Sequence, residues 1–465
     1  MGRRRVRVGV AAVAGVLFAG ASAVPAHAVT PVACNTAALI TAINNSNAGT
    51  GDTLSLTSYC VYTLTDADGQ LPTITQPLVI QGNHATIRRD PNAGTQFRIF
   101  EVASGGSLTM DTLTVMNGFA PSGQDGGGVL LSGTMTGLTT TDVNFQGNRA
   151  QNGGGLAVEG STNTVSITGG LINDNGAAQT MPLGGGGGIY GESNNPITLN
   201  SVTLSGNRSG FGGAISLNNF TQSLTLNKCA VRDNTGLRYG GAIGNAGGAS
   251  TITITDSSIT DNQVPRSKNG GGAIAAQNTT LNVTGSTISG NTLSGFTTNA
   301  SGAAVGGGVV VESAVTTLDS TQVTGNRIIG AGGQGAGIAA SGGTLTLQNG
   351  TSVTGNLTSG RYSQGGGLYI NNILGPTTVA VDDSHIDRNR ITGTGSVAGG
   401  IFNTGGTFSF SNASSVNNNT APPAPAPGGV YTDVAINAVD AGTTFTGNAP
   451  TNCLLSPAPV TGCVG

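Results

Sequence analysis

The sequence predicts an all-β fold: a right-handed parallel β-helix of about eleven regular coils, with irregular coils and a helical cap at its N-terminal end. Gly accounts for 79 of the 465 residues and charged residues for only 8%, which excludes an acidic disordered chain and a helical repeat. A unit of about thirty residues recurs along the chain, as it does in solenoids. Short Thr/Ser/Val/Ile stretches with period-two alternation, such as 251–255 and 344–347, indicate the strands.

Each repeat joins two motifs, and residues 145–158 are the clearest copy. The first is an aliphatic or Phe residue three positions before an Asn, which recurs at Asn148, Asn175, Asn207, Asn234, Asn262, Asn291, Asn326, Asn356, Asn389, Asn419 and Asn448. The second is a Gly-Gly or Gly-Ala corner followed by an aliphatic residue, at Val129, Leu156, Ile189, Ile215, Ile243, Ile274, Val309, Ile338, Leu368, Ile401 and Val430. We expect like residues to stack on like residues from coil to coil.

The eleven Asn residues are predicted to have a structural role rather than to form eleven ligand sites. Asn tolerates the left-handed backbone conformation, which suits a corner that every coil turns in the same way. Stacked amides can also hydrogen-bond from coil to coil, as in the Asn ladders of stacked sheets. Both properties predict a ladder of Asn side chains along one corner.

The alternation of Phe/Val/Ile-x-x-Asn with Gly-Gly-Ala/Val/Leu-Ile-like corners resembles the repeats of polymorphic outer membrane proteins. It is similar, more broadly, to the secreted right-handed parallel β-helix proteins. The resemblance covers about residues 85–450 and is specific for the fold, not for a reaction. It implies adhesion at a cell surface, which is an inference from fold to function. Members of the autotransporter kind end in a membrane barrel; because seventeen residues follow Asn448, we do not expect outer-membrane insertion.

The first 28 residues are typical of a secretory signal peptide. Four arginines within the first seven residues precede an apolar run over 8–24, which ends in an Ala-His-Ala motif at 26–28. The run is short for a membrane span, and a retained anchor is the alternative. We therefore expect a secreted, extracellular or cell-surface protein that has no membrane span after cleavage.

Residues 29–84 are predicted to form an N-terminal cap with a short helix starting after Asn35, because a solenoid's terminal coil must be covered. The parallel β-helix is expected over 85–450, followed by a Cys-containing tail over 451–465. In an exported chain, disulfides Cys34–Cys60 and Cys453–Cys463 are plausible. Cys229 is left over; it is interpreted as a buried thiol, with a reactive cysteine as the alternative.

Insertions gather at one corner of the coil. From each corner aliphatic residue to the next Asn the chain takes 17 to 21 residues, whereas from the Asn to the next aliphatic it takes 8 to 18. We call the loops between each repeat Asn and the next glycine corner the loop edge. Variable loops on one side of a solenoid often mark its contact face.

The loop edge is basic although the protein is acidic overall. Eleven basic residues lie between Gly126 and Pro450, and eight are in these loops, whereas none of the fourteen acidic residues is. The eight are Arg149, Arg208, Arg238, Arg266, Lys268, Arg327, Arg361 and Arg390. They predict contact with an anionic polysaccharide or envelope polymer. The alternative is a surface that is simply solvated, or one whose arginines pair with neighbouring acids such as Asp174. Eight cations over ten coils are too dilute for a strong nucleic-acid groove.

Aromatic residues follow the corner aliphatic in the last three repeats, as Tyr369, Phe402 and Tyr431. Their side chains should point outward and stack as a ladder. Such a ladder can form a platform for sugars, or it can simply stabilise the sheet.

Catalytic motifs are sparse. The densest polar cluster spans 382–387, but Asp383 lies six residues before its repeat Asn, as do Asp142 and Asp256, which indicates a recurring Asx turn. Gly-His-Gly and Arg-Ile-Lys motifs are absent, and Trp is absent. No spacing predicts a metal site or a cofactor. The sequence therefore favours a non-catalytic binding protein; the alternative is a lyase or glycoside hydrolase acting on acidic polysaccharide.

Overall fold

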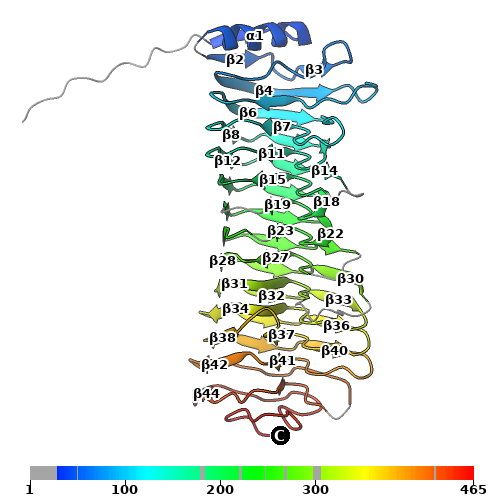
Figure 1. The fold of residues 1–465 in the computed structure, drawn as a ribbon, viewed down its shortest axis with the longest axis vertical. Helices are drawn as coiled ribbons and strands as arrows, with labels where there is room; N and C mark the ends of the chain where they lie inside the picture. Colours follow the sequence, from blue (N-terminus) through cyan, green and yellow to red (C-terminus); the bar gives the residue numbers. More distant parts are fainter. Residues whose placement is uncertain are drawn as a thin grey trace, which may run out of the picture.

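The computed structural model describes residues 29–49, 51–178, 184–218, 222–246, 248–265, 270–296, 305–423 and 426–465. The predicted signal peptide lies outside these ranges. The chain forms an all-β, right-handed parallel solenoid of about twelve turns with one short helix near its N-terminus (Figure 1). The predicted fold class is confirmed. No helix in the described ranges is long and apolar enough to cross a membrane.

Each regular coil contributes strands to four columns, and every strand pairs in parallel with its equivalent in the next coil. The first column follows the glycine corner: β5 (Phe100–Val102), β7 (Val129–Leu131), β11 (Leu156–Val158), β15 (Ile189–Glu192), β19 (Ile215–Asn218), β23 (Ile243–Ala246), β27 (Ile274–Gln277), the start of β31 (Val309–Asp319), the start of β34 (Ile338–Gln348), β37 (Leu368–Asn371), β41 (Ile401–Thr404) and β43 (Val430–Thr432).

The second column follows in the same coils, and β31 and β34 run through both columns without a break. Its strands are β8 (Gly137–Thr141), β12 (Thr164–Thr168), β16 (Pro196–Asn200), β20 (Ser223–Asn227), β24 (Thr251–Thr255), β28 (Thr280–Thr284), β38 (Thr377–Asp382), β42 (Thr407–Ser411) and β44 (Ala438–Val439).

The third column leads into the repeat Asn and the fourth column leaves it. The third comprises β9 (Asn144–Gln146), β13 (Leu171–Asn173), β17 (Thr203–Ser205), β21 (Ala230–Arg232), β25 (Ser258–Thr260), β29 (Thr287–Ser289), β32 (Gln322–Thr324), β35 (Ser352–Thr354) and β39 (His385–Asp387). The fourth is a separate nine-stranded sheet of β10 (Arg149–Ala150), β14 (Gly176–Ala177), β18 (Arg208–Phe211), β22 (Thr235–Tyr239), β26 (Gln263–Val264), β30 (Thr292–Phe296), β33 (Arg327–Gly330), β36 (Leu357–Ser359) and β40 (Arg390–Thr392).

The stack extends toward the N-terminus beyond residue 85. There β1 (Val29–Val32) pairs with β2 (Asp52–Leu56), while β3 (Val61–Leu64) and β2 both pair with the long β4 (Pro77–Arg89), which pairs with β6 (Ser107–Met116). Helix α1 (Thr36–Ala48) lies across this end of the stack (Figure 1). Its N-cap is Asn35, whose side chain accepts from the Ala38 N–H at 2.8 Å, as the sequence predicts.

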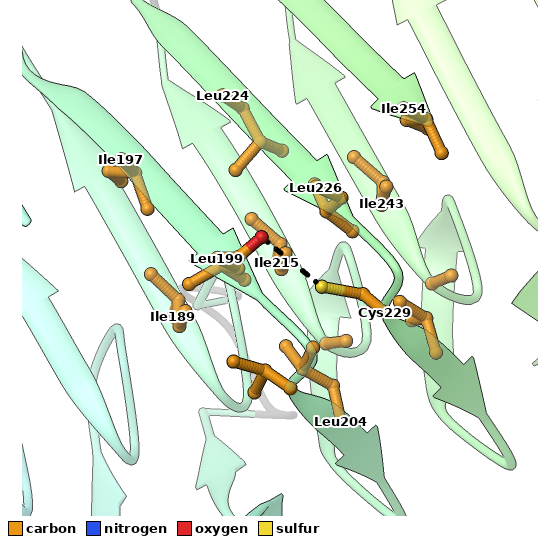
Figure 2. Close-up of a cluster of buried hydrophobic side chains, with 14 of the residues drawn as sticks. Ile189, Ile197, Leu199, Leu204, Ile215, Leu224, Leu226, Cys229, Ile243 and Ile254 are labelled. Atoms are coloured by element: carbon orange, nitrogen blue, oxygen red, sulfur yellow. Dashed lines mark hydrogen bonds between the residues drawn. The ribbon is translucent and has the colours of Figure 1, made fainter. Parts of the chain in front are cut away.

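One continuous hydrophobic core fills the solenoid. The eleven corner aliphatic residues named above lie in register and are at most 1% exposed. Cys229 lies in this core beside Leu199, Ile215 and Leu226 (Figure 2). Its Sγ donates to the Leu199 carbonyl at 3.3 Å, and burial raises its pKa, which favours the interpretation as an inert buried thiol.

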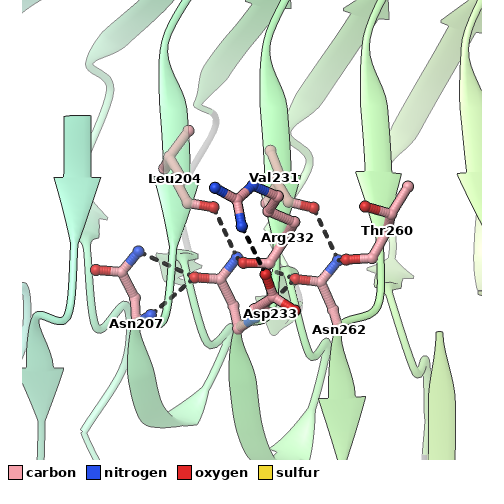
Figure 3. A network of polar contacts seen from close by, with 8 residues as sticks. Leu204, Asn207, Val231, Arg232, Asp233, Thr260 and Asn262 are labelled. Carbon is pink, nitrogen blue, oxygen red and sulfur yellow. Dashed lines mark hydrogen bonds and ion pairs between the residues drawn. The ribbon is translucent and has the colours of Figure 1, made fainter. Parts of the chain in front are cut away.

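The Asn ladder runs the length of the regular array, and Figure 3 shows the part of it between Asn207 and Asn262. From Asn148 to Asn419, each Asn donates both its backbone N–H and its Nδ2 to the Oδ1 of the Asn in the next coil, over 2.8–3.1 Å. Asn448 ends the row by donating to Asn452. Each Nδ2 also donates to a carbonyl of the preceding coil, such as that of Val231 for Asn262 at 2.9 Å.

The expectation that Asn itself adopts the left-handed conformation is wrong. The residue before each ladder Asn has positive φ, whether it is Gly147, Asp174, Asp233 or Arg388. No ladder Asn has positive φ. The corner thus divides the two tasks: the preceding residue bends the backbone, and the Asn amide bridges the coils.

Two disulfides lie at the ends of the solenoid. Cys34 pairs with Cys60 beside the N-terminal helix, with a Cα–Cα distance of 5.6 Å. Cys453 pairs with Cys463 in the tail, at 6.2 Å.

Candidate functional site

The fourth column begins directly after the Asn ladder, and its first residue is exposed in the coils where it is Arg or Gln and half-buried or buried in the coils between. In register along the column, this position holds Arg149, Gly176, Arg208, Thr235, Gln263, Thr292, Arg327, Leu357 and Arg390. At this position arginine therefore recurs at every second coil, with Gln263 as the one departure, and the residues at the same position in the coils between are uncharged. Arg149 and Arg208 are about two coil rises apart, roughly 10 Å, and so are Arg327 and Arg390.

A cleft opens at the N-terminal part of this column. Its volume is about 660 Å³, and it is lined by residues 119–123, 149–151 and 174–178 with Gln96, Gly206 and Arg208. Gly176 stands in register between Arg149 and Arg208, so the two guanidinium-bearing chains flank a position without a side chain. Asp174, at the same cleft, adopts a left-handed conformation with φ of 56°.

Five exposed arginines of the loop edge have no carboxylate partner in the described part of the chain. The only salt bridges within the described ranges join Arg98 to Glu101 at 3.3 Å and Arg232 to Asp233 at 2.8 Å. Neither involves a predicted contact residue. In the described part of the chain, the guanidinium groups of Arg149, Arg208, Arg327, Arg361 and Arg390 make no hydrogen bond to the protein. The interpretation as surface ion pairs therefore loses its support for these five.

The remaining predicted contact residues with a positive charge do not lie at the first position of the fourth column. Arg238 is exposed on β22. Arg361 is exposed at the tip of the loop after β36. Arg266 and Lys268 lie outside the described residues.

The predicted aromatic ladder exists, but it is covered. Tyr369 stacks on Phe402 with centroids 5.7 Å apart, and Phe402 stacks on Tyr431 at 4.9 Å. Tyr369 and Phe402 are only 4% and 6% exposed. Ala398, from the loop of the neighbouring coil, packs in the same cluster. The placement favours stabilisation of the sheet over a platform for sugars.

Sequence reasoning missed a more accessible aromatic residue on the loop edge, Tyr362. It is 67% exposed, and its ring lies against Gly395 of the next coil, where an added Cβ would stand 2.7 Å from Cδ1. Its N–H donates to the Thr394 carbonyl at 3.1 Å. The signal was available in the sequence, because Tyr362 aligns with Gly332 and Gly395 in loops of equal length.

Sequence reasoning also missed a carboxylate cluster at the end of the first column. Glu159 follows β11 and Glu192 ends β15 in the next coil, and Asp125 reaches Glu159 from the loop before β7. Burial and the neighbouring Asp125 carboxylate raise the pKa of Glu159 to about 7. Asn152 donates to Asp125 from its N–H and Nδ2, both at 3.0 Å. Near pH 7 a part of the Glu159 side chains is therefore protonated.

The polar residues of 382–387 have separate structural roles. Asp383 adopts φ of 43° in the bend between the second and third columns, in agreement with the predicted turn. The Ser415 hydroxyl lies 3.0 Å from both oxygens of Asp387 and 2.9 Å from Nδ1 of His385. Because the carboxylate can only accept, Ser415 donates to it, so His385 does not activate this hydroxyl as a base.

Among the described residues, no group of three or more His, Cys, Asp and Glu has the arrangement of a metal site.

The sequence matches no family model and no curated protein sequence. Among solved structures, the chain is similar to the enzymatically active domain of tailspike protein 2 from bacteriophage CBA120, with 12% sequence identity and a TM-score of 0.27. The similarity covers 92% of this chain and 49% of that one, so the chain spans about half of its length. So weak a likeness carries no argument about function.

Proposed function

We propose that this is an exported, non-catalytic β-helix protein that binds an anionic polysaccharide or envelope polymer along its loop edge. The observation that carries the proposal is the pair Arg149 and Arg208, exposed without a protein partner on either side of Gly176 in a cleft of about 660 Å³. Guanidinium groups donate in a planar fork that suits carboxylate, sulfate and phosphate groups. In the described ranges, no carboxylate of the protein forms a salt bridge with either arginine.

Export is part of the same proposal. The signal-peptide pattern over 1–28 and two disulfides both suit an oxidising, extracellular environment. We also propose that the repeats are of the polymorphic outer membrane protein type, with adhesion as their role. The paired columns of corner aliphatic residues and ladder Asn support that assignment. The proposed mature organisation is a cap over 29–84, the β-helix over 85–450 and a tail over 451–465.

A binding measurement tests the proposal directly. The mature protein is tested on an array of uronic, sulfated and teichoic polymers, and the best polymer is then titrated against Arg149→Ala/Arg208→Ala. Loss of both cations should weaken binding about tenfold or more, and added salt should weaken the wild type. The matched control is Arg232→Ala, an exposed arginine on the third column that pairs with Asp233. Equal binding by the double variant and the wild type would contradict the proposed site.

The second candidate function is hydrolysis or elimination on an acidic polysaccharide. The observation that favours it is the cluster of Glu159, Asp125 and Glu192, because a carboxyl group whose pKa is raised by burial and by neighbouring carboxylates can act as a general acid. The test is turnover of uronic-acid polymers by the wild type and by Glu159→Gln. Turnover that disappears in Glu159→Gln but persists in Asp383→Ala would establish this candidate. Absence of turnover at pH 5 to 8 would remove it.

A further inference from the structure

The spacing of the loop-edge arginines points to the chemistry of the polymer. We call every second coil, starting with that of Arg149, an even coil, and the coils between them odd coils. Four of the five even coils hold an arginine at the first position of the fourth column, namely Arg149, Arg208, Arg327 and Arg390, and the fifth holds Gln263. The odd coils between them carry Gly176, Thr235, Thr292 and Leu357. A coil rises about 4.8 Å, so the cations repeat at roughly 10 Å along the solenoid axis. A sugar in an extended chain advances by a distance comparable to one coil.

Resting on the proposed function, we propose that the loop edge selects a polysaccharide in which acidic and neutral sugars alternate, bound parallel to the solenoid axis. Acidic sugars meet the arginines of the even coils. Neutral sugars lie over the odd coils, where the side chains are small, hydroxylated or apolar. A polymer with an acidic group on every sugar would place half of its charges opposite fourth-column positions that hold no cation, where desolvation of those charges has no compensation at that position.

Tyr362 supplies a contact for a neutral sugar in this arrangement. It belongs to the odd coil of Leu357, between the coils of Arg327 and Arg390. The residues aligned with Tyr362 on either side, Gly332 and Gly395, have no side chain to cover its ring. The ring rests on Gly395 and remains 67% exposed, which leaves one face for the apolar side of a sugar ring.

The three loops around Tyr362 pair with one another and are free of acids. Residues 326–338, 356–368 and 389–401 have equal length and contain no Asp or Glu. Their backbones hydrogen-bond from coil to coil, for example Gly332 N–H to the Arg361 carbonyl at 2.8 Å. Arg361 in this loop and Arg238 at the far end of β22 lie in odd coils, away from the first position of the fourth column, and both depart from the alternation.

The test compares two soluble polymers of matched length by titration calorimetry. Hyaluronan oligosaccharides alternate glucuronate with N-acetylglucosamine, whereas polygalacturonate oligosaccharides carry a carboxylate on every sugar. We expect tighter binding of hyaluronan by about tenfold at equal chain length. Tyr362→Ala should weaken hyaluronan binding about fivefold, and Tyr362→Phe should restore it because the ring is kept. The matched control is Tyr59→Ala, a 75% exposed tyrosine stacked on His84 at the cap.

The outcomes separate this inference from the proposed function. Equal or tighter binding of polygalacturonate that still depends on Arg149 and Arg208 would overturn the alternation and leave the binding function in place. An effect of Arg361→Ala as large as that of Arg327→Ala would also overturn it, because the charges would then recur at every coil. If the protein binds neither of these two polymers and no polymer on the array, both the alternation and the proposed binding function are overturned.

Discussion

Replacing Asn262 with Ala tests the physical basis of the solenoid. The Asn262 side chain is fully buried and takes part in five hydrogen bonds. Its Nδ2 donates to Asn291 Oδ1, Val231 O and Thr260 O at 2.9–3.0 Å, and its Oδ1 accepts from the N–H and Nδ2 of Asn234 at 3.0 and 2.9 Å.

The expected cost follows from the groups that the substitution leaves behind. Each net hydrogen bond contributes about 0.5–1.5 kcal/mol, and a buried group left without a partner costs about 1–3 kcal/mol. Asn262→Ala leaves the Asn234 N–H without an acceptor inside the corner and removes one donor from the Val231 carbonyl. Allowing for local relaxation and for remaining partners, we expect a loss of about 3–5 kcal/mol in the free energy of unfolding.

The assay must resolve local from global stability, because coils of a solenoid contact only their neighbours. Hydrogen exchange by mass spectrometry should show faster exchange in the coils of Asn234 and Asn262 and little change in coils far away. Urea denaturation measures the global loss. The matched control is Asn282→Ala, a half-exposed Asn one coil away on β28, which should cost less than about 0.5 kcal/mol. Equal effects of the two substitutions would refute the ladder as a source of stability.

Three further predictions concern titration, the thiol and the ends of the solenoid. The pKa of Glu159 in the folded protein is raised from 4.5 to about 7, so the free energy of unfolding of the wild type should fall as pH rises from about 4.5 to about 7. Glu159→Gln should remove that loss. Urea titrations at several pH values should show the variant to be about 1–2 kcal/mol more stable than the wild type at pH 8, a figure that is reduced for solvent screening. Cys229→Ser should shift the unfolding free energy by less than about 1 kcal/mol, because Ser257 fills the equivalent position and donates to a carbonyl two residues back, as Cys229 does; a larger loss in thermal denaturation would contradict this. Replacing Cys34 and Cys60 together with Ser should cost about 3.5 kcal/mol in the loop-entropy model, for a bridge of 26 residues; an unchanged melting temperature would argue that the cap does not unfold with the coils.

The elements that repeat were predictable from the sequence, and the reason is register. Leu156, Ile189 and Ile215 align because each is the residue after a glycine corner, and the corner recurs in every coil. The same holds for the ladder Asn. The left-handed residue was assigned one position too late because its identity varies among Gly, Asp, Arg and Asn, whereas the Asn after it is constant.

Features built from different coils, or from loops folding back, were not predictable in this way. The alternation of β37 predicts that Tyr369 points outward, which is correct, but it says nothing about the loop that then covers the ring. Asp125 and Glu159 are 34 residues apart, and the motif spacing gives no indication that a loop side chain reaches the end of the next strand. The burial of Glu159 therefore depends on tertiary packing between coils, which the repeat pattern does not encode.

Loop length converts the same scaffold into two kinds of surface. Between ladder Asn and corner aliphatic residue, the loops around the cleft take 8, 14 and 8 residues, after Asn148, Asn175 and Asn207. The surface is hollowed there. The three loops around Tyr362 each take 12 residues and pair by backbone hydrogen bonds. A polymer that follows the arginines would therefore enter a cleft at one end and lie on an exposed ring at the other. It follows that lengthening the short loop after Asn148 should impair the cleft without disturbing binding at Tyr362, since solenoid coils respond to change locally.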